Sequence, residues 1–367
     1  MRLCIAHGGD IGEPSGGTDR VSAIAAGLSA QGIDVSLVVP TPSNPPPDRL
    51  GPVDCIYVDA PDSSVARAAM IARTAARRAR ADDAMLQLEH STLAGVGSLL
   101  GVDGYVLDMH DLGHSRFDHV DTPFAPVLKR GVKRLERRAI SEADHVVAVS
   151  DLMVDQIRQF ADVPPNSVSV VPNGYFPETV DRFRDISNVS GRVVFLGTLH
   201  PKVDVDTLVA IARLPAVSEM VVVGDGARHE RLEQAAASSD SLRTTGRLPD
   251  DAAFELVASA EAVVNPQTVS AIQRSSSPVK LYYYAALGKP MIVTPGPSIV
   301  TELVRQSAAV TARSRRHFVK RVESVLDDTS LAGRLSENAQ QAAETFAWSD
   351  RISSFESLYR SHREVQK

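Results

Sequence analysis

Short apolar runs alternate with helix-type periodicity along the chain. In the first half, apolar residues such as Val21, Ile24, Ala25 and Leu28 recur three and four positions apart, as on one face of a helix. We expect strands at 3–6, 33–39, 55–58, 85–88, 105–109, 145–149 and 168–171. Helices are expected from Thr18 or Asp19 to Gly32, and at 63–80, 90–100, 128–142 and 151–160. This alternation predicts a parallel sheet covered by helices on both faces.

The same alternation restarts after a break. Residues 172–177 are rich in proline and turn formers, and the polar segment to Ser190 has no periodicity, which predicts a domain linker. Beyond it we expect strands at 192–196, 220–223, 242–245, 262–264 and 291–294, and a long loop at 265–277. At 367 residues the chain exceeds one ordinary core, so the length favours two domains of roughly 150–200 residues.

One stretch of the second half, 275–290, has the pattern of a short helix with an unusual first turn. Ser277 is a candidate cap, Pro278 is expected at the first helical position, and Gly288 ends the helix. Lys280 then opposes the positive end of the helix dipole, at a cost of roughly 0.3–1 kcal/mol unless an anion lies there. The backbone N–H groups and Lys280 therefore predict half of a phosphate site.

Polar loops follow two strands of the first half. The loop 7–17 is rich in glycine and lies between a strand and a helix, as in the phosphate-facing unit of a doubly wound sheet. The G-x-G-x-x-G spacing is absent and no acidic residue closes the second strand, which disfavours a dinucleotide-dependent oxidoreductase. His110 and Asp111 follow the strand at 105–109. Because such loops line the ligand crevice, we expect both residues to face a cleft.

Two groups of residues raise the alternative of a metal site. Three histidines occur within 110–119, but no second ligand group with fixed spacing accompanies them. Asp204 and Asp206 could hold a divalent cation through phosphates, yet acidic residues are favoured in a first helical turn by the dipole alone. We therefore expect no metal.

Composition limits the class of protein. Hydrophobic residues make up 43% of the chain and charged residues 23%, as in soluble globular proteins. A net charge of -6 argues against nucleic acid as a partner. The two cysteines, Cys4 and Cys55, are interpreted as thiols of a reducing compartment. With no signal-like segment and no apolar run of about 20 residues, we expect a cytoplasmic protein.

The helix at 128–142 is strongly basic. Its charged residues are Lys129, Arg130, Lys133, Arg134, Arg137 and Arg138 against Glu136 and Glu142. We favour a solvated face, and peripheral contact with the anionic inner face of a membrane is the alternative.

Motifs spread over nearly the whole chain resemble one family. They are Gly16-Gly17, His110-Asp111, the run 143–150, 171–174, 195–197, 223–226, Gly246-Arg247 and the stretch 275–290, which is similar to S-P-x-K-L-Y-E-Y-x-A-x-G-K-P. Each is weak alone, but in this order they are specific to the retaining glycosyltransferases of the GT-B fold, family 4 type.

The resemblance implies an α/β protein with two Rossmann-like, doubly wound domains that face a cleft. The acceptor-side domain would span 1–175, the nucleotide-sugar-binding domain 176–345, and a C-terminal helix within 346–367 would cross back to the first domain. The implied reaction is transfer of a hexosyl group, with retention, from a UDP- or GDP-linked sugar to a hydroxyl acceptor that is a glycan, a lipid-linked molecule or a small molecule. It implies no cofactor and no obligatory metal.

The resemblance also implies roles for particular residues. His110, Asp111 and Lys202 would be catalytic, with His110 against the donor sugar and Lys202 on the distal phosphate. The donor would be bound by Gly16, Gly17, Thr198, Lys202, Gly224, Asp225, Arg247, Leu248, Ser277, Pro278, Val279, Lys280 and Tyr283.

The chain departs from the family pattern at three positions. Thr198 stands where an arginine is usual, and Ser275 and Tyr283 stand where the family has two glutamates. Lys280 is expected to replace the lost arginine, and the phenol of Tyr283 to reach the ribose in place of the second glutamate. These departures leave two alternatives, a catalytically silent GT-B subunit that binds a nucleotide or a partner transferase, and a sugar-nucleotide epimerase of the same fold.

Overall fold

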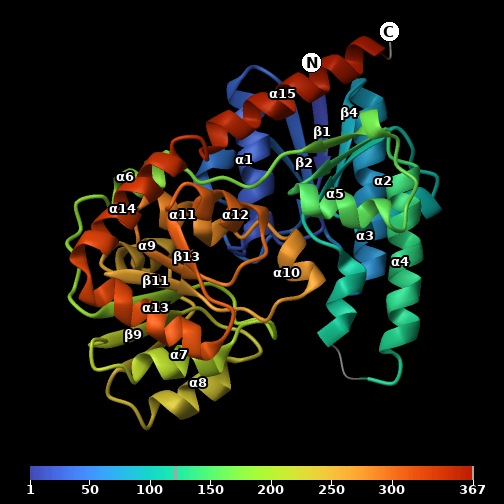
Figure 1. Cartoon of the computed structure of the whole chain (residues 1–367). Coiled ribbons are helices and arrows are strands. Elements are labelled where there is room, and N and C mark those ends of the chain that lie inside the picture. The colour runs from blue at the N-terminus through green and yellow to red at the C-terminus, as the bar shows by residue number, and fades with distance from the viewer. Residues whose placement is uncertain (120–121, 366–367) are drawn as a thin grey trace. The chain divides into compact units, whose positions relative to one another are not determined.

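The computed structural model describes residues 1–119 and 122–365, which form two compact units (Figure 1). The first unit contains Met1–Asn173, the short segment Ser275–Ser277 and the C-terminal helix α15 (Trp348–Val365). The second contains Gly174–Arg274 and Pro278–Ala347. Each unit is built around its own parallel sheet.

The sheet of the first unit has seven strands in the order β3-β2-β1-β4-β5-β6-β7. They are β1 (Arg2–Ala6), β2 (Asp34–Pro40), β3 (Asp54–Val58), β4 (Met85–Glu89), β5 (Tyr105–Met109), β6 (His145–Ala148) and β7 (Val168–Val170). All pairs are parallel, and β1 lies between β2 and β4, with Leu3 opposite Val35 on one side and Met85 on the other. The strand order reverses beside β1, and a doubly wound sheet binds ligands at the carboxyl end of such a point.

Helices cover both faces of this sheet because its strands are apolar on both sides. Leu3 and Ile5 of β1 pack in one core with residues of α1 and α15, whereas Cys4 and Ala6 pack in another with residues of α2 and α3. Gly27 of α1 allows close packing, since a Cβ atom there would lie 2.5 Å from Ile352 of α15. The helices are α1 (Gly16–Ala30), α2 (Ser64–Asp82), α3 (Ser91–Leu99), α4 (Ala125–Ser141) and α5 (Asp151–Arg158), with the 3₁₀ helices η1 (Asp48–Leu50), η2 (Gly113–His119) and η3 (Pro165–Ser167).

The second unit has a six-stranded sheet in the order β10-β9-β8-β11-β12-β13. Its strands are β8 (Arg192–Leu196), β9 (Glu219–Val223), β10 (Leu242–Gly246), β11 (Ala262–Asn265), β12 (Met291–Val293) and β13 (Ala309–Thr311). Its helices are α6 (Pro177–Asp181), α7 (Val205–Ala212), α8 (His229–Ala236), α9 (Asp250–Ala258), α10 (Ala271–Ser275), α11 (Val279–Ala286), α12 (Ser298–Arg305), α13 (Arg315–Asp327) and α14 (Thr329–Ala343). The order reverses beside β8, so the carboxyl end of β8 is the second place where a ligand is expected.

The fold class predicted from the sequence is confirmed, and every predicted strand is present with its ends shifted by a residue or two. Three local predictions were wrong, and one strand was missed. Strand β13 was not predicted, the expected loop at 265–277 contains α10, and the basic helix begins at Ala125 rather than 128. Helix α1 begins at Gly16, before Thr18, because the hydroxyl of Ser15 accepts a hydrogen bond from Thr18 N at 3.1 Å and caps the helix.

The stretch 275–290 also begins differently from the prediction. Pro278 is the N-cap of α11 and no side chain caps this helix. The hydroxyl of Ser277 instead accepts a hydrogen bond from Asn173 N at 3.1 Å. Gly288, with a φ of 62°, follows the end of the helix as predicted. The first turn of α11 therefore carries neither a side-chain cap nor an acidic residue.

Candidate functional site

Three imidazoles gather at the carboxyl edge of the first sheet. His7 follows β1, His90 follows β4 and His110 follows β5. The ring centroids of His90 and His110 are 4.2 Å apart, and those of His7 and His90 are 6.1 Å apart. A Cβ atom on Gly17 would lie 3.6–3.8 Å from atoms of all three rings, so this glycine faces the histidines. Thus two predicted site residues, Gly17 and His110, lie together, with Gly16 exposed beside them.

The backbone of His90 is in an unusual conformation. Its φ is 70°, in a region that non-glycine residues rarely adopt and that costs on the order of 1–3 kcal/mol. Such strain gathers at functional sites, where the surrounding structure holds it in place. This conformation was not predicted from the sequence, and neither His90 nor His7 was predicted as a site residue. Their position directly after strands 85–88 and 3–6 is the signal that could have identified them.

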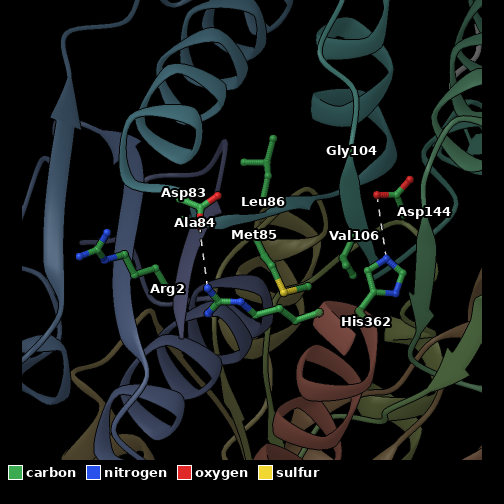
Figure 2. Close-up of a pocket in the computed structure, with 10 residues that line it drawn as sticks. Arg2, Asp83, Ala84, Met85, Leu86, Gly104, Val106, Asp144 and His362 are labelled. Atoms are coloured by element: carbon green, nitrogen blue, oxygen red, sulfur yellow. Dashed lines mark ion pairs between the residues drawn. The ribbon is translucent and has the colours of Figure 1, made fainter. Parts of the chain in front are cut away.

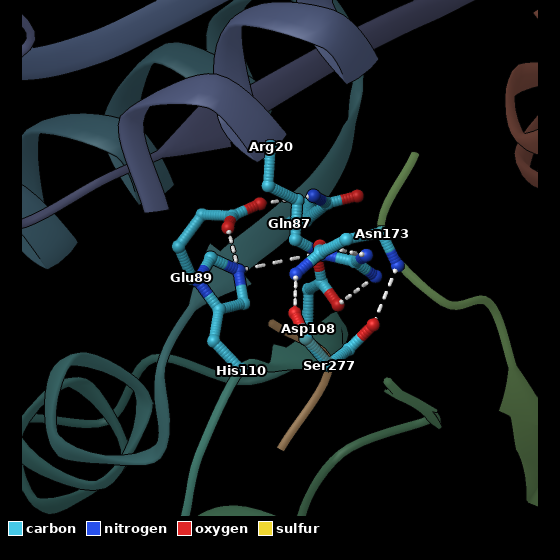
Figure 3. A network of polar contacts seen from close by, with 7 residues as sticks. All are labelled: Arg20, Gln87, Glu89, Asp108, His110, Asn173 and Ser277. Carbon is cyan, nitrogen blue, oxygen red and sulfur yellow. Dashed lines mark hydrogen bonds and ion pairs between the residues drawn. The ribbon is translucent and has the colours of Figure 1, made fainter. Parts of the chain in front are cut away.

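A buried ion pair fixes this edge of the sheet (Figure 3). The guanidinium of Arg20, from α1, donates to both carboxylate oxygens of Asp108, from β5, at 2.7 and 2.8 Å, and neither side chain is exposed. Arg20 also donates to Asn173 Oδ1 at 3.0 Å, and Asn173 Nδ2 donates to the carbonyl of Ser277 at 2.7 Å. Ser277, predicted as a donor-binding residue, is thereby placed within the first unit and hydrogen-bonded to Asn173.

His110 lies between two carboxylates of this network. Its Nε2 atom is 2.6 Å from Glu89 and 3.4 Å from Asp108, and the Gln87 amide donates to Glu89 on its other side. Burial alone lowers the pKa of His110, but Glu89 and Asp108 outweigh it and raise this pKa to about 9. Burial and then Asp108 raise the pKa of Glu89. At neutral pH His110 is therefore protonated and forms an ion pair with Glu89.

Two neighbouring titratable groups, Asp108 and His7, differ in charge at neutral pH. Burial raises the pKa of Asp108, but Arg20 and His110 outweigh it and hold that pKa well below its usual range. Burial lowers the pKa of His7 to about 3, so this imidazole stays neutral. Asp111, predicted as catalytic, is partly buried directly after His110.

Glu89, Asp108 and His110 also form a group whose ligand atoms lie within 4.8 Å of one another, as in a metal site. Arg20 already donates to both oxygens of Asp108, and protonated His110 contacts Glu89. A metal ion would have to compete with both cations, so this donor set does not suit a resident metal.

The two metal candidates from the sequence were the pair Asp204 and Asp206 and the three histidines of 110–119. Asp204 caps α7 by accepting from Thr207 N at 3.1 Å, and Asp206 pairs with Arg315 at 2.9 Å. Both acidic residues therefore have structural partners. Within the three-histidine segment, His114 pairs with the buried Glu136, and the side chain of His119 lies outside the described residues.

Glycine loops form the carboxyl edge of the second sheet. Gly197 N, after β8, donates to Val223 O at 2.9 Å, and Gly224 N, after β9, donates to Gly246 O at 2.8 Å. A Cβ atom on Gly224 would lie 2.3 Å from Gly197 O, and the φ angles of the two glycines are 135° and 129°. These close approaches require glycine. The loops bring together the predicted residues Thr198, Gly224 and Asp225, and the first and last of these are exposed.

Lys280 of α11 reaches this edge. Its ammonium nitrogen is 4.2 Å from the centroid of the Phe195 ring, at the end of β8. Among the described residues, no carboxylate lies within ion-pair distance of it. Burial, and then the nearby Lys202, lower the pKa of Lys280 from 10.5 to about 7. Two lysines that repel each other beside a helix N-terminus form a place for an anion.

We expect replacement of Gly197 by alanine to displace Lys280. The added Cβ would lie 2.5 Å from the ammonium nitrogen and 2.8 Å from Cε, so the lysine must move. Gly32 is a matched control, because its φ is 80° and nothing lies within 4 Å of an added Cβ. Both variants should lose on the order of 1–3 kcal/mol of stability through backbone strain. Only Gly197→Ala should also weaken nucleoside diphosphate binding, and equal affinities of the two variants in calorimetry would contradict this role.

Tyr283 lies in an aromatic cluster of the second unit. Its ring is 4.6 Å from that of Phe254 and 6.2 Å from that of Tyr175, measured between centroids. Only 4% of the residue is exposed. Arg247 is exposed after β10, and Leu248 is partly buried beside it. The contact of Tyr283 with a ribose therefore stays a prediction.

A small polar pocket lies at the opposite, amino-terminal edge of the first sheet (Figure 2). Arg363 and His362 of α15 face Asp83 and Asp144, each at 3.9 Å. The pocket contains none of the predicted site residues. Carboxyl edges, not amino edges, carry ligand sites in such sheets, so we assign it to the packing of α15.

Two family models match the chain. "Glycosyl transferase 4-like domain" matches residues 15–174 and "Glycosyl transferases group 1" matches residues 190–328. Between them they cover most of the chain, one for each sheet. Residues 15–174 are therefore a glycosyl transferase 4-like domain and residues 190–328 a glycosyl transferases group 1 domain, and the two parallel sheets form the GT-B fold.

Solved structures share this fold at low sequence identity. Sucrose-phosphate synthase from Thermosynechococcus elongatus has a TM-score of 0.82 at 15% identity, covering 99% of both chains. HepE from Anabaena, in complex with UDP-glucose, has a TM-score of 0.75 at 16% identity, covering 98% of this chain and 100% of that one. WaaG, a glycosyltransferase involved in lipopolysaccharide biosynthesis, has a TM-score of 0.74 at 15% identity, covering 96% and 98%. No curated protein matches the sequence.

Proposed function

We propose that this glycosyltransferase moves a hexosyl group from a UDP- or GDP-linked sugar to a hydroxyl acceptor, with retention of configuration. The observation that carries the proposal is Lys280, a lysine with a lowered pKa and no carboxylate partner among the described residues, beside the glycine loops of the second sheet. The complex of HepE with UDP-glucose supports a nucleotide-sugar donor.

The chemistry requires positive charge where the diphosphate leaves. Lys280, Lys202 and the uncapped N–H groups at the start of α11, at Val279, would supply it. Charge of this kind, fixed before the reaction, stabilises a developing anion without reorganisation. In this proposal Lys280 takes the place of the arginine that Thr198 replaces.

Retention would follow from a same-face displacement, in which the departing phosphate accepts the proton of the acceptor hydroxyl. The carboxylates nearest His110, those of Glu89 and Asp108, are engaged by His110 itself and by Arg20, so neither is poised as a nucleophile. His110 would instead position the donor sugar, with its orientation fixed by Glu89.

A panel of sugar nucleotides tests the function. UDP- and GDP-linked hexoses are screened for binding and slow hydrolysis, and the active donor is then used with hydroxyl acceptors, with the anomeric configuration of the product read by NMR. Diphosphate binding without any hydrolysis or transfer would indicate a silent subunit. Release of an altered sugar nucleotide without an acceptor would indicate an epimerase.

Donor binding is expected to take up protons above neutral pH. At about pH 8 Lys280 is mostly neutral in the unliganded chain, since its pKa is about 7, and a bound diphosphate favours the charged form. Affinity should therefore fall as pH rises above about 7, by up to about tenfold per unit. Calorimetry of UDP or GDP in buffers of different protonation enthalpy measures the uptake. It should vanish in Lys280→Met, and its absence from the unmodified chain would contradict the assignment.

A further inference from the structure

The first turn of α4 exposes large apolar side chains. Phe124, at the N-cap, is 71% exposed, and Val127 and Leu128 are 64% and 50% exposed. Single exposed apolar residues are ordinary, but three within one helical turn form a patch. In Figure 1 this end of α4 protrudes beyond α3. No helix in the described part of the chain is long and apolar enough to span a membrane.

Basic residues continue this exposed face. Arg130 and Arg134 follow Val127 at the spacing i, i+3, i+7 and are both exposed, so the three share one side of the helix. Among the described residues, neither arginine has a carboxylate within ion-pair distance. The chain as a whole carries a net charge of -6, so the basic face of α4 is a local feature and does not reflect the overall charge.

Three later charged residues of α4 contact the protein. Glu136 is buried and accepts from Ser91 Oγ at 2.8 Å and Gly113 N at 2.7 Å. Arg137 donates to Phe160 O at 2.7 Å, and Arg138 pairs with Glu142 at 3.0 Å. The basic helix predicted at 128–142 is thus divided, with its later charges engaged in the fold and its first two turns directed to solvent.

We propose that Phe124, Val127, Leu128, Arg130 and Arg134, the α4 tip, dock on the surface of an anionic lipid bilayer. Apolar side chains beside cations are the combination that inserts into the headgroup boundary while the cations bind lipid phosphates. A stable protein interface buries about 800 Å² on each partner, more than five side chains at one end of a helix offer. A bilayer needs no such area, because a few inserted side chains and nearby cations suffice.

The test is sedimentation of the full chain with large vesicles at low and high salt. One set of vesicles is phosphatidylcholine alone and the other contains added phosphatidylglycerol. The unmodified chain should bind the anionic vesicles, should bind less at high salt, and should stay off the zwitterionic ones.

Two pairs of variants assign the binding to the tip. Arg130→Gln with Arg134→Gln should lower the partition coefficient by about fivefold for each arginine, and Phe124→Ser with Leu128→Ser by about tenfold or more. Val65→Ser with Leu99→Ser is the matched control, since both residues are 60% exposed on other helices of the same unit, and it should bind as the unmodified chain does. Equal melting temperatures show that the variants fold.

Two results would overturn the proposal. One is an unmodified chain that does not bind anionic vesicles, or tip variants that bind them equally well. The other is self-association in ultracentrifugation that depends on the α4 tip while the vesicles stay unbound, which would make this surface a protein interface. Neither result bears on the donor site, which the nucleotide panel tests separately.

Discussion

Replacing Lys280 with methionine is expected to lower donor binding and transfer by on the order of a hundredfold or more while making the unliganded chain more stable. The lysine has no carboxylate partner among the described residues, and burial lowers its pKa to about 7. Its charge therefore costs stability until an anion binds. Because the folded pKa lies below the unfolded value of 10.5, the cost is complete below pH 7 and is relieved between about pH 7 and 10.5.

Lys289 is a matched control. Burial lowers its pKa as well, to about 8, but its ammonium group donates to Asn188 Oδ1 at 2.8 Å and to the carbonyls of Ala258 and Ala260. Lys289→Met leaves these acceptors without their donor, so it should destabilise the chain by about 1–3 kcal/mol and leave nucleotide affinity unchanged. Thermal unfolding and calorimetry of both variants at about pH 6 separate the two effects.

Lys202→Ala extends the comparison. It should also reduce transfer by about a hundredfold, because it removes a second positive charge from the proposed diphosphate site. Unchanged turnover in Lys202→Ala and Lys280→Met together would refute the diphosphate site.

Lys280 could be identified from the sequence because its unfavourable interaction with the helix dipole is local. A lysine in the first turn of a helix, after a proline, opposes the helix dipole whatever the rest of the chain does. Its partners could not be found, since Gly197 and Phe195 are far away in sequence and only the sheet brings them together. The capping role of Ser277 was wrong for the same reason, because Asn173, a distant residue, donates to its hydroxyl.

The histidine site shows the same limit. His110 could be predicted, since a polar residue directly after a buried strand lies at a carboxyl edge in any parallel sheet. Its environment could not, because Glu89 and Arg20 belong to other elements and their charges are balanced only after folding. The sequence of a strand that contains a buried carboxylate does not show which distant residue pairs with that carboxylate.

The buried pair of Arg20 and Asp108 leads to the second large effect. Asp108→Asn should destabilise the first unit by about 3–5 kcal/mol, because it leaves a buried guanidinium without its counter-charge. Arg20→Met with Asp108→Leu should recover much of this loss, since no buried charge then lacks a partner. Arg80→Met is the control in the same unit. Its ion pair with Asp103 is exposed at 67% and 86%, and exposed pairs contribute little.

The location of the loss distinguishes this pair from a general packing defect. Each unit has its own core, so unfolding need not be a single two-state transition. A bound nucleoside diphosphate should raise the melting temperature of the second unit through mass action and so identify its transition in scanning calorimetry. Asp108→Asn should lower only the transition of the first unit, and Arg20→Met with Asp108→Leu should restore that transition. The pKa of His110, followed by NMR, should nevertheless fall from about 9 in the double variant, because the charge of Asp108 is gone. A variant that lowers both transitions equally would show that the pair does not act within the first unit.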